Sequence, residues 1–315
     1  MLSAPTHRKG LRVGIATCSL APELDEDGTL LRAAFESLGV PSAVGVWNDP
    51  AVDWSLFDTV LVRSTWDYPS QRTAFLRWTR SCAATINPAD VLQWNTDKSY
   101  LLDLAAAGVP IVPTEFVAPG AAPSVGWRDV VIKPSVGGSA ADTGRFATTA
   151  TPGAQCLIAS LHAAGREVMV QPYQHGIDTD GETSLVFIDG AFSHAVRRAP
   201  LLERCDGSSA GPGEQGGGPR GPVTVAEVLA TVRQVEPTPH QHAVAAAAIE
   251  AAPGGRAALA YARVDLVPGA TGPALLELEA TDCFLFLAYG DATAASRLAA
   301  STCRRRDAGS GFGLA

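Results

Sequence analysis

The sequence predicts a mixed α/β protein in which a parallel α/β unit precedes a larger α+β part. Three observations support this fold class. Apolar strands near residues 11–18, 42–47 and 57–65 alternate with helical patterns, as in a parallel sheet. Short strands and a hairpin turn dominate the middle of the chain. Two helical segments and a second hairpin follow towards the carboxyl end.

The N-terminal unit is expected to span residues 1–93. A helix over residues 27–38 separates the first two strands, and Gly39 marks its end. The segment QRTAFLRWTRSCA has helical spacing and follows the third strand. No G-x-G-x-x-G motif follows the first strand, so the dinucleotide-binding class has little support.

The second part begins near Asn87-Pro88 and divides into two expected lobes, over residues 94–172 and 173–302. Asn95 and Thr96 predict the N-cap of a helix that runs to about Ala107. The expected strands cover residues 111–117, 129–133, 167–172 and 184–188, and the last continues into a hairpin with an Asp189-Gly190 turn.

The later segments follow the same pattern. Residues 206–222 are rich in glycine and predict a loop, to which we assign no role. Helices are expected near residues 225–235 and 240–252, and the second hairpin occupies about 259–281. The end of the chain, from Ser301 on, is expected to be frayed, with residues 303–315 forming a tail.

Composition limits the function classes. The net charge is −8 and the pI is near 5.2, which disfavours a nucleic-acid partner because an acidic surface repels phosphate backbones. No apolar run approaches the roughly 20 residues that cross a bilayer, and the first residues lack the apolar core of a signal peptide. The six cysteines form no C-x-x-C pair. We therefore expect a cytoplasmic protein with no membrane partner.

The second hairpin gathers charged residues on one face. The strands YARVDLV and ALLELEA alternate, so Arg263 and Asp265 share one face, as do Glu277 and Glu279. A turn symmetrical about Thr271 places Asp265 opposite Glu277 and Arg263 opposite Glu279. Three close carboxylates repel each other, and Mg²⁺ with its oxygen ligands would compensate them. A solvated face with an Arg263–Glu279 salt bridge is the alternative, and a register slip of one residue would separate the faces.

Two lysines point to a phosphate ligand. Lys133 ends an apolar strand just before Gly137, Gly138 and Ser139, whose backbone N–H groups could cradle a phosphate. Lys98 lies in the first turn of the expected helix, where a cation opposes the helix dipole unless an anion binds nearby. The alternative for Lys133 is a surface lysine beside a tight solvent loop. For Lys98 it is an ordinary exposed lysine tolerated beside Asp97.

Further positions fit a nucleotide. An apolar strand runs into Gln171 and Tyr173, which could border an adenine ring. Glu182 and Arg197 lie on the hairpin that follows and could serve a ribose and phosphates. The alternative for Gln171 and Tyr173 is an edge strand that ends at Pro172. For Glu182 and Arg197 the alternative is an ordinary surface charge.

A substrate site is expected beyond the carboxyl ends of the N-terminal parallel strands. The loop after the third strand mixes charge, hydroxyl groups and aromatic rings: Arg63, Ser64, Thr65, Asp67 and Tyr68. Arg63 could fix a carboxylate, and Asp67 or the cluster at residues 25–27 an amino group. For that cluster, acids that favour a helix N-terminus are the simpler reading.

Taken in order, these pieces resemble the ATP-grasp superfamily of ligases. The strings are NTDK (95–98), VIKPSVGGS (131–139), VQPY (170–173), GETSLVFIDG (181–190), SHAVR (193–197), RVD (263–265) and ELE (277–279). Together they cover roughly residues 90–290. Within the superfamily, LVRSTWDY (61–68) and ELEATDCFLF (277–286) make the chain most similar to the cyclo-ligases that act on O-ureido-D-serine.

The resemblance implies a fold and a set of roles. The fold is an N-terminal parallel α/β subdomain followed by two mixed α+β lobes that clamp ATP. Magnesium would bind Asp265, Glu277 and Glu279, and Arg263 and Arg197 would act on the transferred phosphoryl group. The residues implied to contact ATP are Lys98, Lys133, Gly137, Gly138, Ser139, Gln171, Tyr173 and Glu182. Many relatives carry asparagine in place of Glu279, which leaves the exact coordination open.

The implied activity is the activation of a small amino-acid-derived carboxylate as an acyl phosphate, followed by attack of a nitrogen. In the cyclo-ligase reading the nitrogen belongs to the same molecule, and D-cycloserine forms. An intermolecular ligase similar to glutathione synthetase, or an ATP-binding module without catalysis, remains an alternative. The sequence does not determine the oligomeric state, and a homodimer is compatible with it.

Overall fold

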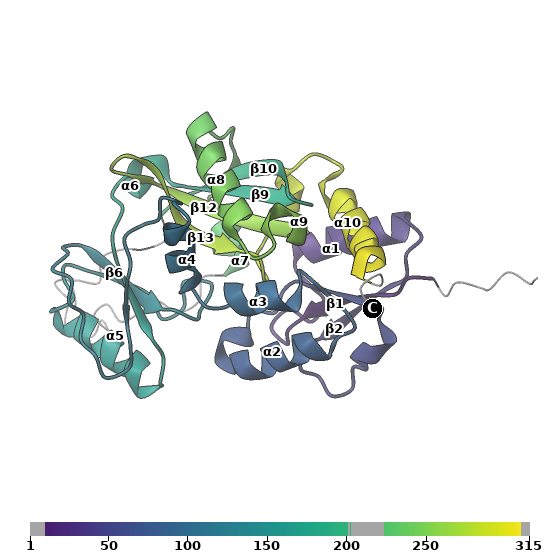
Figure 1. Ribbon diagram of the computed structural model, residues 1–315, viewed down its shortest axis with the longest axis horizontal. Helices are drawn as coiled ribbons and strands as arrows, with labels where there is room; N and C mark the ends of the chain where they lie inside the picture. The colour runs from purple at the N-terminus through teal and green to yellow at the C-terminus, as the bar shows by residue number, and fades with distance from the viewer. Residues whose placement is uncertain (1–9, 201, 203–223, 310–315) are drawn as a thin grey trace, which may run out of the picture.

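Three β-sheets organise the protein, as the computed structural model shows for residues 10–200, 202 and 224–309 (Figure 1). The side chains of residues 225 and 306–309 are not part of this description. In the view of Figure 1, the five-stranded sheet lies above the other two. The glycine-rich segment 206–222 falls outside the described residues. No described helix combines the length and the apolar character that a bilayer crossing requires.

The N-terminal unit is the expected parallel sheet. Its strand order is β2 (Ser42–Val46), β1 (Val13–Thr17), β3 (Thr59–Val62) and β4 (Thr85–Ile86). Helices α1 (Glu26–Ser37) and α2 (Arg72–Ser81) connect these strands, with short 3₁₀ turns at Trp54–Leu56 and Tyr68–Gln71. Asp25 caps α1 by accepting a hydrogen bond of 2.7 Å from the backbone N–H of Gly28.

The second sheet is antiparallel and has the order β5 (Glu115–Val117), β8 (Val168–Pro172), β6 (Val130–Pro134) and β7 (Gly144–Phe146). Its apolar face packs on α5 (Pro152–Ala163) through Val130, Ile132, Val168 and Val170. Alternation along the strands therefore turns Lys133 and Gln171 to the opposite face. We call this unit the small lobe. Neither β7 nor α5 was expected from the sequence.

The third sheet contains both predicted hairpins. Its order is β11 (Arg233–Gln234), β10 (Ala191–Arg198), β9 (Glu182–Ile188), β12 (Tyr261–Gly269) and β13 (Gly272–Glu279). One face packs on α8 (Pro239–Ala251) and on α4 (Tyr100–Ala106) in the largest apolar core. The shorter helices α6 (Ile177–Asp180), α7 (Val225–Leu229) and α9 (Gly255–Ala258) lie in the connections. The helix expected at 225–235 is thus shorter, because Arg233 and Gln234 pair with β10.

The helix expected from Asn95 to Ala107 is wrong. Two helices occupy this region, α3 (Ala89–Asn95) and α4, and Thr96 is the C-cap of the first. Lys98 lies between them, and its backbone N–H donates to the carbonyl of Ser135 in the small lobe at 2.9 Å. This tertiary hydrogen bond interrupts the helix, and the side chain of Asn95 bonds to β13 instead of capping a helix.

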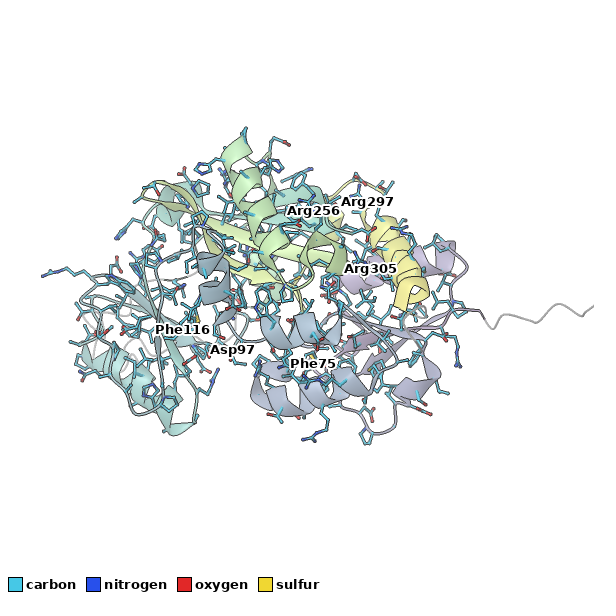
Figure 2. The ribbon with its side chains drawn as sticks, in the orientation of Figure 1. Phe75, Asp97, Phe116, Arg256, Arg297 and Arg305 are labelled. Atoms are coloured by element: carbon cyan, nitrogen blue, oxygen red, sulfur yellow. The ribbon has the colours of Figure 1, made fainter. Side chains whose placement is uncertain are left out.

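The expectation of a frayed end is also wrong for the described residues. Helix α10 (Ala294–Gly309) runs across the boundary expected at residue 303 and packs against α1 of the N-terminal unit (Figure 1). Arg305 on α10 donates to the carbonyls of Ala257 and Leu259 at 2.6 and 2.9 Å (Figure 2). The end of the chain therefore joins the N-terminal unit to the third sheet.

Candidate active site

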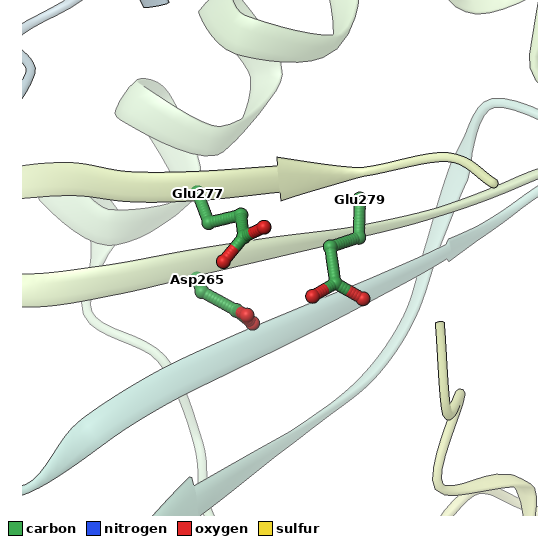
Figure 3. Close-up of side chains that lie close together, drawn as sticks. All are labelled: Asp265, Glu277 and Glu279. Carbon is green, nitrogen blue, oxygen red and sulfur yellow. The ribbon is translucent and has the colours of Figure 1, made fainter. Parts of the chain in front are cut away.

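Three carboxylates meet on the face of the third sheet that is turned away from α8. Asp265 pairs with Glu277 across β12 and β13, and Arg263 pairs with Glu279, as the alternation predicted. The ligand oxygens of Asp265, Glu277 and Glu279 all lie within 4.8 Å of one another. Figure 3 shows the three side chains converging on one point. This spacing suits a hard divalent cation with oxygen ligands.

The turn that produces this register differs from the expected one. Gly269 pairs with Gly272, so the turn is centred between Ala270 and Thr271 rather than on Thr271. A register shift between Asp265 and Leu266 then adds one residue on β13 and restores the pairing of the charged residues. The bulge keeps all three carboxylates on one face.

Cations hold each of these carboxylates in place. Arg263 donates to Asp265 through Nε at 2.9 Å and Nη2 at 2.8 Å, and its Nη2 lies 2.9 Å from Glu279. Lys98 Nζ lies 3.0 Å from Glu277. Burial raises the pKa of Glu279 to about 8, while Arg263 opposes this effect. Burial acts in the same direction on Asp265, but the arginines hold the pKa of Asp265 well below its usual range.

Arg198, rather than Arg197, completes the charged face. Arg198 pairs with Glu182 across β10 and β9, forms an ion pair with it, and lies 3.1 Å from Asp265. Arg197 is the neighbouring residue on the same strand, so alternation turns it to the opposite face. The structure therefore does not bring Arg197 to the cluster. Burial raises the pKa of Glu182 to about 7, against the effect of Arg198.

The small lobe supplies two lysines from the opposite side. Lys98 Nζ donates to the carbonyl of Gly137 at 2.5 Å, which ties the glycine turn to Glu277. Burial lowers the pKa of Lys133, and no described carboxylate lies within 4.0 Å of its ammonium group. Lys133 is half-buried, and a partly desolvated cation without an ion pair favours an anionic ligand. Among the expected phosphate ligands, Ser139 has a left-handed backbone with φ of +52°.

The expected adenine residues lie on the same side of the small lobe as Lys133. Gln171 is buried and donates to the hydroxyl of Thr114 at 2.8 Å. Tyr173 packs under the guanidinium of Arg145, whose carbon lies 3.3 Å from the ring centroid. Arg145 also makes two hydrogen bonds of 2.8 Å to Asp129. Arg145 was missed, because nothing in the sequence near it indicated a partner for Tyr173.

The expected substrate loop lies at the carboxyl end of β3, as the parallel topology requires. Arg63, Ser64, Thr65 and Tyr68 are buried there. Arg63 is fully enclosed, donates to the carbonyl of Cys283 at 2.7 Å and lies 3.6 Å from Asp27. Arg63 therefore contacts protein groups, and the structure does not expose its side chain to a substrate. Asp67 accepts a hydrogen bond of 2.7 Å from the indole of Trp47.

Two asparagines connect this loop region to the carboxylate face, whereas the sequence indicated only a boundary at Asn87 and a helix cap at Asn95. Asn87 and Asn95 are buried, and each bonds to the backbone of Ala280 just after β13. Asn87 also bonds to Ala260 and Tyr261 at the start of β12. Only tertiary packing assigns these partners, because the bonded residues are more than 170 positions apart in the chain.

Comparisons with known proteins identify relatives of this chain. The model of the N-terminal domain of D-cycloserine synthetase DcsG matches residues 13–89. The cycloserine biosynthesis protein DcsG of Streptomyces lavendulae is 33% identical over 297 residues, which cover 89% of this chain and 94% of that protein. The crystal structure of D-cycloserine synthetase DcsG matches with a TM-score of 0.80 at 32% identity, over 94% of this chain and 99% of its own.

A more distant match shows the fold alone. The D-alanine–D-alanine ligase of Bacillus anthracis complexed with ATP has a TM-score of 0.63 at 14% identity, over 95% of this chain and 100% of that one. The ATP-grasp fold and the resemblance inferred from the sequence are thus confirmed. The chain belongs to the D-cycloserine synthetase family of ATP-grasp carbon–nitrogen ligases.

Proposed function

We propose that the protein is an ATP- and Mg²⁺-dependent ligase that cyclises O-ureido-D-serine to D-cycloserine. The identity of 33% to DcsG over 89% of the chain supports the reaction. The observation that carries the proposal is the convergence of Asp265, Glu277 and Glu279 opposite two lysines, the buried Lys98 and the half-buried Lys133. A triphosphate and its metal would occupy the space between these two groups.

The donor set fits magnesium. All three ligands are carboxylates, and Glu277 and Glu279 keep 21% and 25% of their side-chain surface exposed, so an ion can reach them. When bound, Mg²⁺ would neutralise the charge on the phosphate oxygens. Lys98 and Lys133 would hold the phosphates, and Arg263 and Arg198 would stabilise the phosphoryl group in transfer.

The reaction balances without an enzyme nucleophile. The substrate carboxylate attacks the γ-phosphorus of ATP, which gives an acyl phosphate and ADP. The nitrogen bonded to the side-chain oxygen then attacks the acyl carbon, closes the five-membered ring and expels phosphate. Water hydrolyses the remaining carbamoyl group to CO₂ and ammonia. The protein's part is to position the substrate and neutralise charge.

One incubation tests the proposal. The full chain with ATP, Mg²⁺ and O-ureido-D-serine as the only amino compound should release ADP and yield cycloserine by mass analysis. ADP that appears only after a second amine is added would favour an intermolecular ligase. Thermal stabilisation by ATP–Mg²⁺ without ADP across a panel of amino-acid derivatives would favour a binding module.

A substitution tests the metal site separately. Glu277→Gln keeps the size of the side chain and removes one ligand charge, so phosphate release should fall about 100-fold or more. The control is Glu36→Gln on the exposed surface of α1, which should retain the activity of the unsubstituted protein. Unchanged phosphate release by Glu277→Gln would show that the metal assignment is wrong.

A further inference from the structure

The bend that follows β13 carries one more acidic residue, Asp282, three positions beyond Glu279. Both neighbours of Asp282 are fixed by the rest of the protein. The carbonyl of Thr281 accepts a hydrogen bond of 2.5 Å from the hydroxyl of Tyr261, and the carbonyl of Cys283 accepts one of 2.7 Å from Arg63. The backbone of Asp282 is therefore held between the N-terminal unit and the third sheet.

The other carboxylates around the reaction centre already have partners. Glu277 lies 3.0 Å from Lys98, and Glu279 lies 2.9 Å from Arg263. Asp265 binds Arg263 and Arg198. By contrast, within residues 10–200, 202 and 224–309, no cationic nitrogen lies within 4.0 Å of the Asp282 carboxylate.

The acids that the sequence suggested for an amino group are engaged elsewhere. Asp67 accepts from the indole of Trp47 at 2.7 Å, and Asp25 caps α1. Asp27 accepts from the backbone N–H groups of Leu285 and Leu287 at 2.5 and 2.8 Å. Among these four acids, Asp282 alone is partly exposed and has neither a cation nor a hydrogen bond from another residue of the described chain.

The surroundings of Asp282 belong to the substrate side of the site. Burial, and after it the charge of Asp282, raise the pKa of the Tyr68 phenol, and burial raises the pKa of Asp282 itself to about 7. On the neighbouring loop after β3, the hydroxyls of Ser64 and Thr65 and two nitrogens of Arg63 are buried without hydrogen-bond partners.

We propose that Asp282 binds the α-ammonium group of the substrate and so makes the ligase selective for acids with a free α-amine. This proposal rests on the proposed function. The carboxylate of the substrate must reach the γ-phosphate beside Glu277 and Glu279, and in an α-amino acid the ammonium group is only two bonds from the carboxylate carbon. Asp282 follows Glu279 by three residues and has a carboxylate without a cation in the described chain. An ammonium group needs such a partner once it leaves water, and its charge would favour the ionised form of Asp282.

A comparison of two substrates tests this role. O-ureido-D-serine is compared with 3-(ureidooxy)propanoic acid, the same molecule without the α-amino group, by steady-state ADP release. The unsubstituted protein should prefer the amino compound in kcat/KM by about 10- to 150-fold, the usual range for a charge-assisted hydrogen bond. In Asp282→Asn this preference should fall to within about threefold, through a higher KM for the amino compound alone.

Controls separate binding from folding. The KM for ATP and the melting temperature should not change in Asp282→Asn, and Asp282→Glu, which keeps the charge, should retain part of the preference. Asp90→Asn makes the same chemical change on the exposed start of α3 and should behave as the unsubstituted protein. Equal losses on both substrates, or no preference in the unsubstituted protein, would overturn the proposal.

The experiment distinguishes failure of the proposed function from failure of the role proposed for Asp282. If O-ureido-D-serine yields no ADP but another α-amino acid does, the proposed function fails. The same ratio, measured with that amino acid and its analogue without the amine, then still decides the role of Asp282. A protein that accepts no α-amino acid overturns both.

Discussion

Asn87 follows β4 and connects the N-terminal unit to the third sheet, so its replacement by alanine should destabilise the protein. Its Nδ2 donates to the carbonyls of Tyr261 and Ala280 at 2.9 and 2.8 Å, and its Oδ1 accepts from the backbone N–H of Ala260 at 2.7 Å. Asn87 is fully buried, so water does not replace these bonds without rearrangement.

The expected loss of stability follows from the three hydrogen bonds of Asn87. A buried polar group left without a partner costs about 1–3 kcal/mol, so Asn87→Ala should lower the free energy of unfolding by roughly 3 kcal/mol or more. At about 2.1 cal/mol/K per residue, the unfolding entropy of the 315-residue chain is about 0.66 kcal/mol/K. The melting temperature should therefore fall by about 4–5 °C or more.

Scanning calorimetry measures this change, and urea unfolding checks it independently. The matched control is Asn48→Ala at an exposed position, which should change stability by no more than about 0.5 kcal/mol. Hydrogen exchange of the Ala260 amide should also accelerate in Asn87→Ala, because this N–H loses its acceptor. A fall of less than about 1 °C, with unchanged exchange, would refute the assignment of Asn87 as a structural connection.

Three further predictions concern other parts of the molecule. Gly181→Ala should cost at least about 1–2 kcal/mol in urea unfolding, because φ is +70° and the added Cβ would lie 2.5 Å from the carbonyl oxygen of Arg198; an unchanged midpoint would contradict this. Burial acts to raise the pKa of Asp189, but hydrogen bonds from Ser301 and two arginines of α10 lower it to about 2. This stability is present above pH 4 and is lost as the pH falls through 2, so Asp189→Asn should cost about 1 kcal/mol at pH 7, after allowance for its partial exposure, and nothing near pH 1. Lys133→Met should leave the melting temperature without nucleotide equal or higher, because it removes a half-buried cation that has no ion pair in the described chain, yet it should weaken ATP binding about 10- to 100-fold by calorimetry. Full ATP affinity in this variant would exclude the phosphate role.

The carboxylate face could be predicted because it depends on local rules. Side chains alternate along a strand, and a short connection limits the register of a hairpin to a few choices. Asp265 and Glu277 therefore had to be neighbours unless the register slipped. The two-residue turn by itself would have produced such a slip, and the bulge beside Leu266 corrects it. The sequence predicted the right pairing from a turn centred on Thr271, whereas the observed turn is centred between Ala270 and Thr271.

The same rule was not applied to β10, where it separates Arg197 from Arg198. Glu182 and Asp265 face one side of the sheet, and only Arg198 shares that side. The pairing register between β9 and β10 was needed to choose between two adjacent arginines. An Asp189-Gly190 turn of two residues, counted outward, would pair Glu182 with Arg197. The register shift between Phe192 and His194 moves the pairing by one residue to Arg198, so the turn alone did not indicate the right arginine.

Long-range contacts account for the remaining differences. The helix expected to start at Asn95 is broken because Asn95 bonds to β13 and the backbone of Lys98 bonds to Ser135. Likewise, α10 is held by Asp189 and by carbonyls near Leu259, all of which lie far away in the sequence. Capping and composition describe only neighbours along the chain, so they could not anticipate these bonds.

The sequence by itself determined the parallel N-terminal unit, the two hairpins and the face on which Asp265, Glu277 and Glu279 meet, because strand periodicity and turn residues act over a few positions. Tertiary structure alone decided that, among the described residues, no carboxylate lies within 4.0 Å of the half-buried Lys133 ammonium group and no cation within 4.0 Å of the Asp282 carboxylate. Both facts depend on which charges the folded chain brings within about 4 Å, and that distance is fixed by packing rather than by order along the chain.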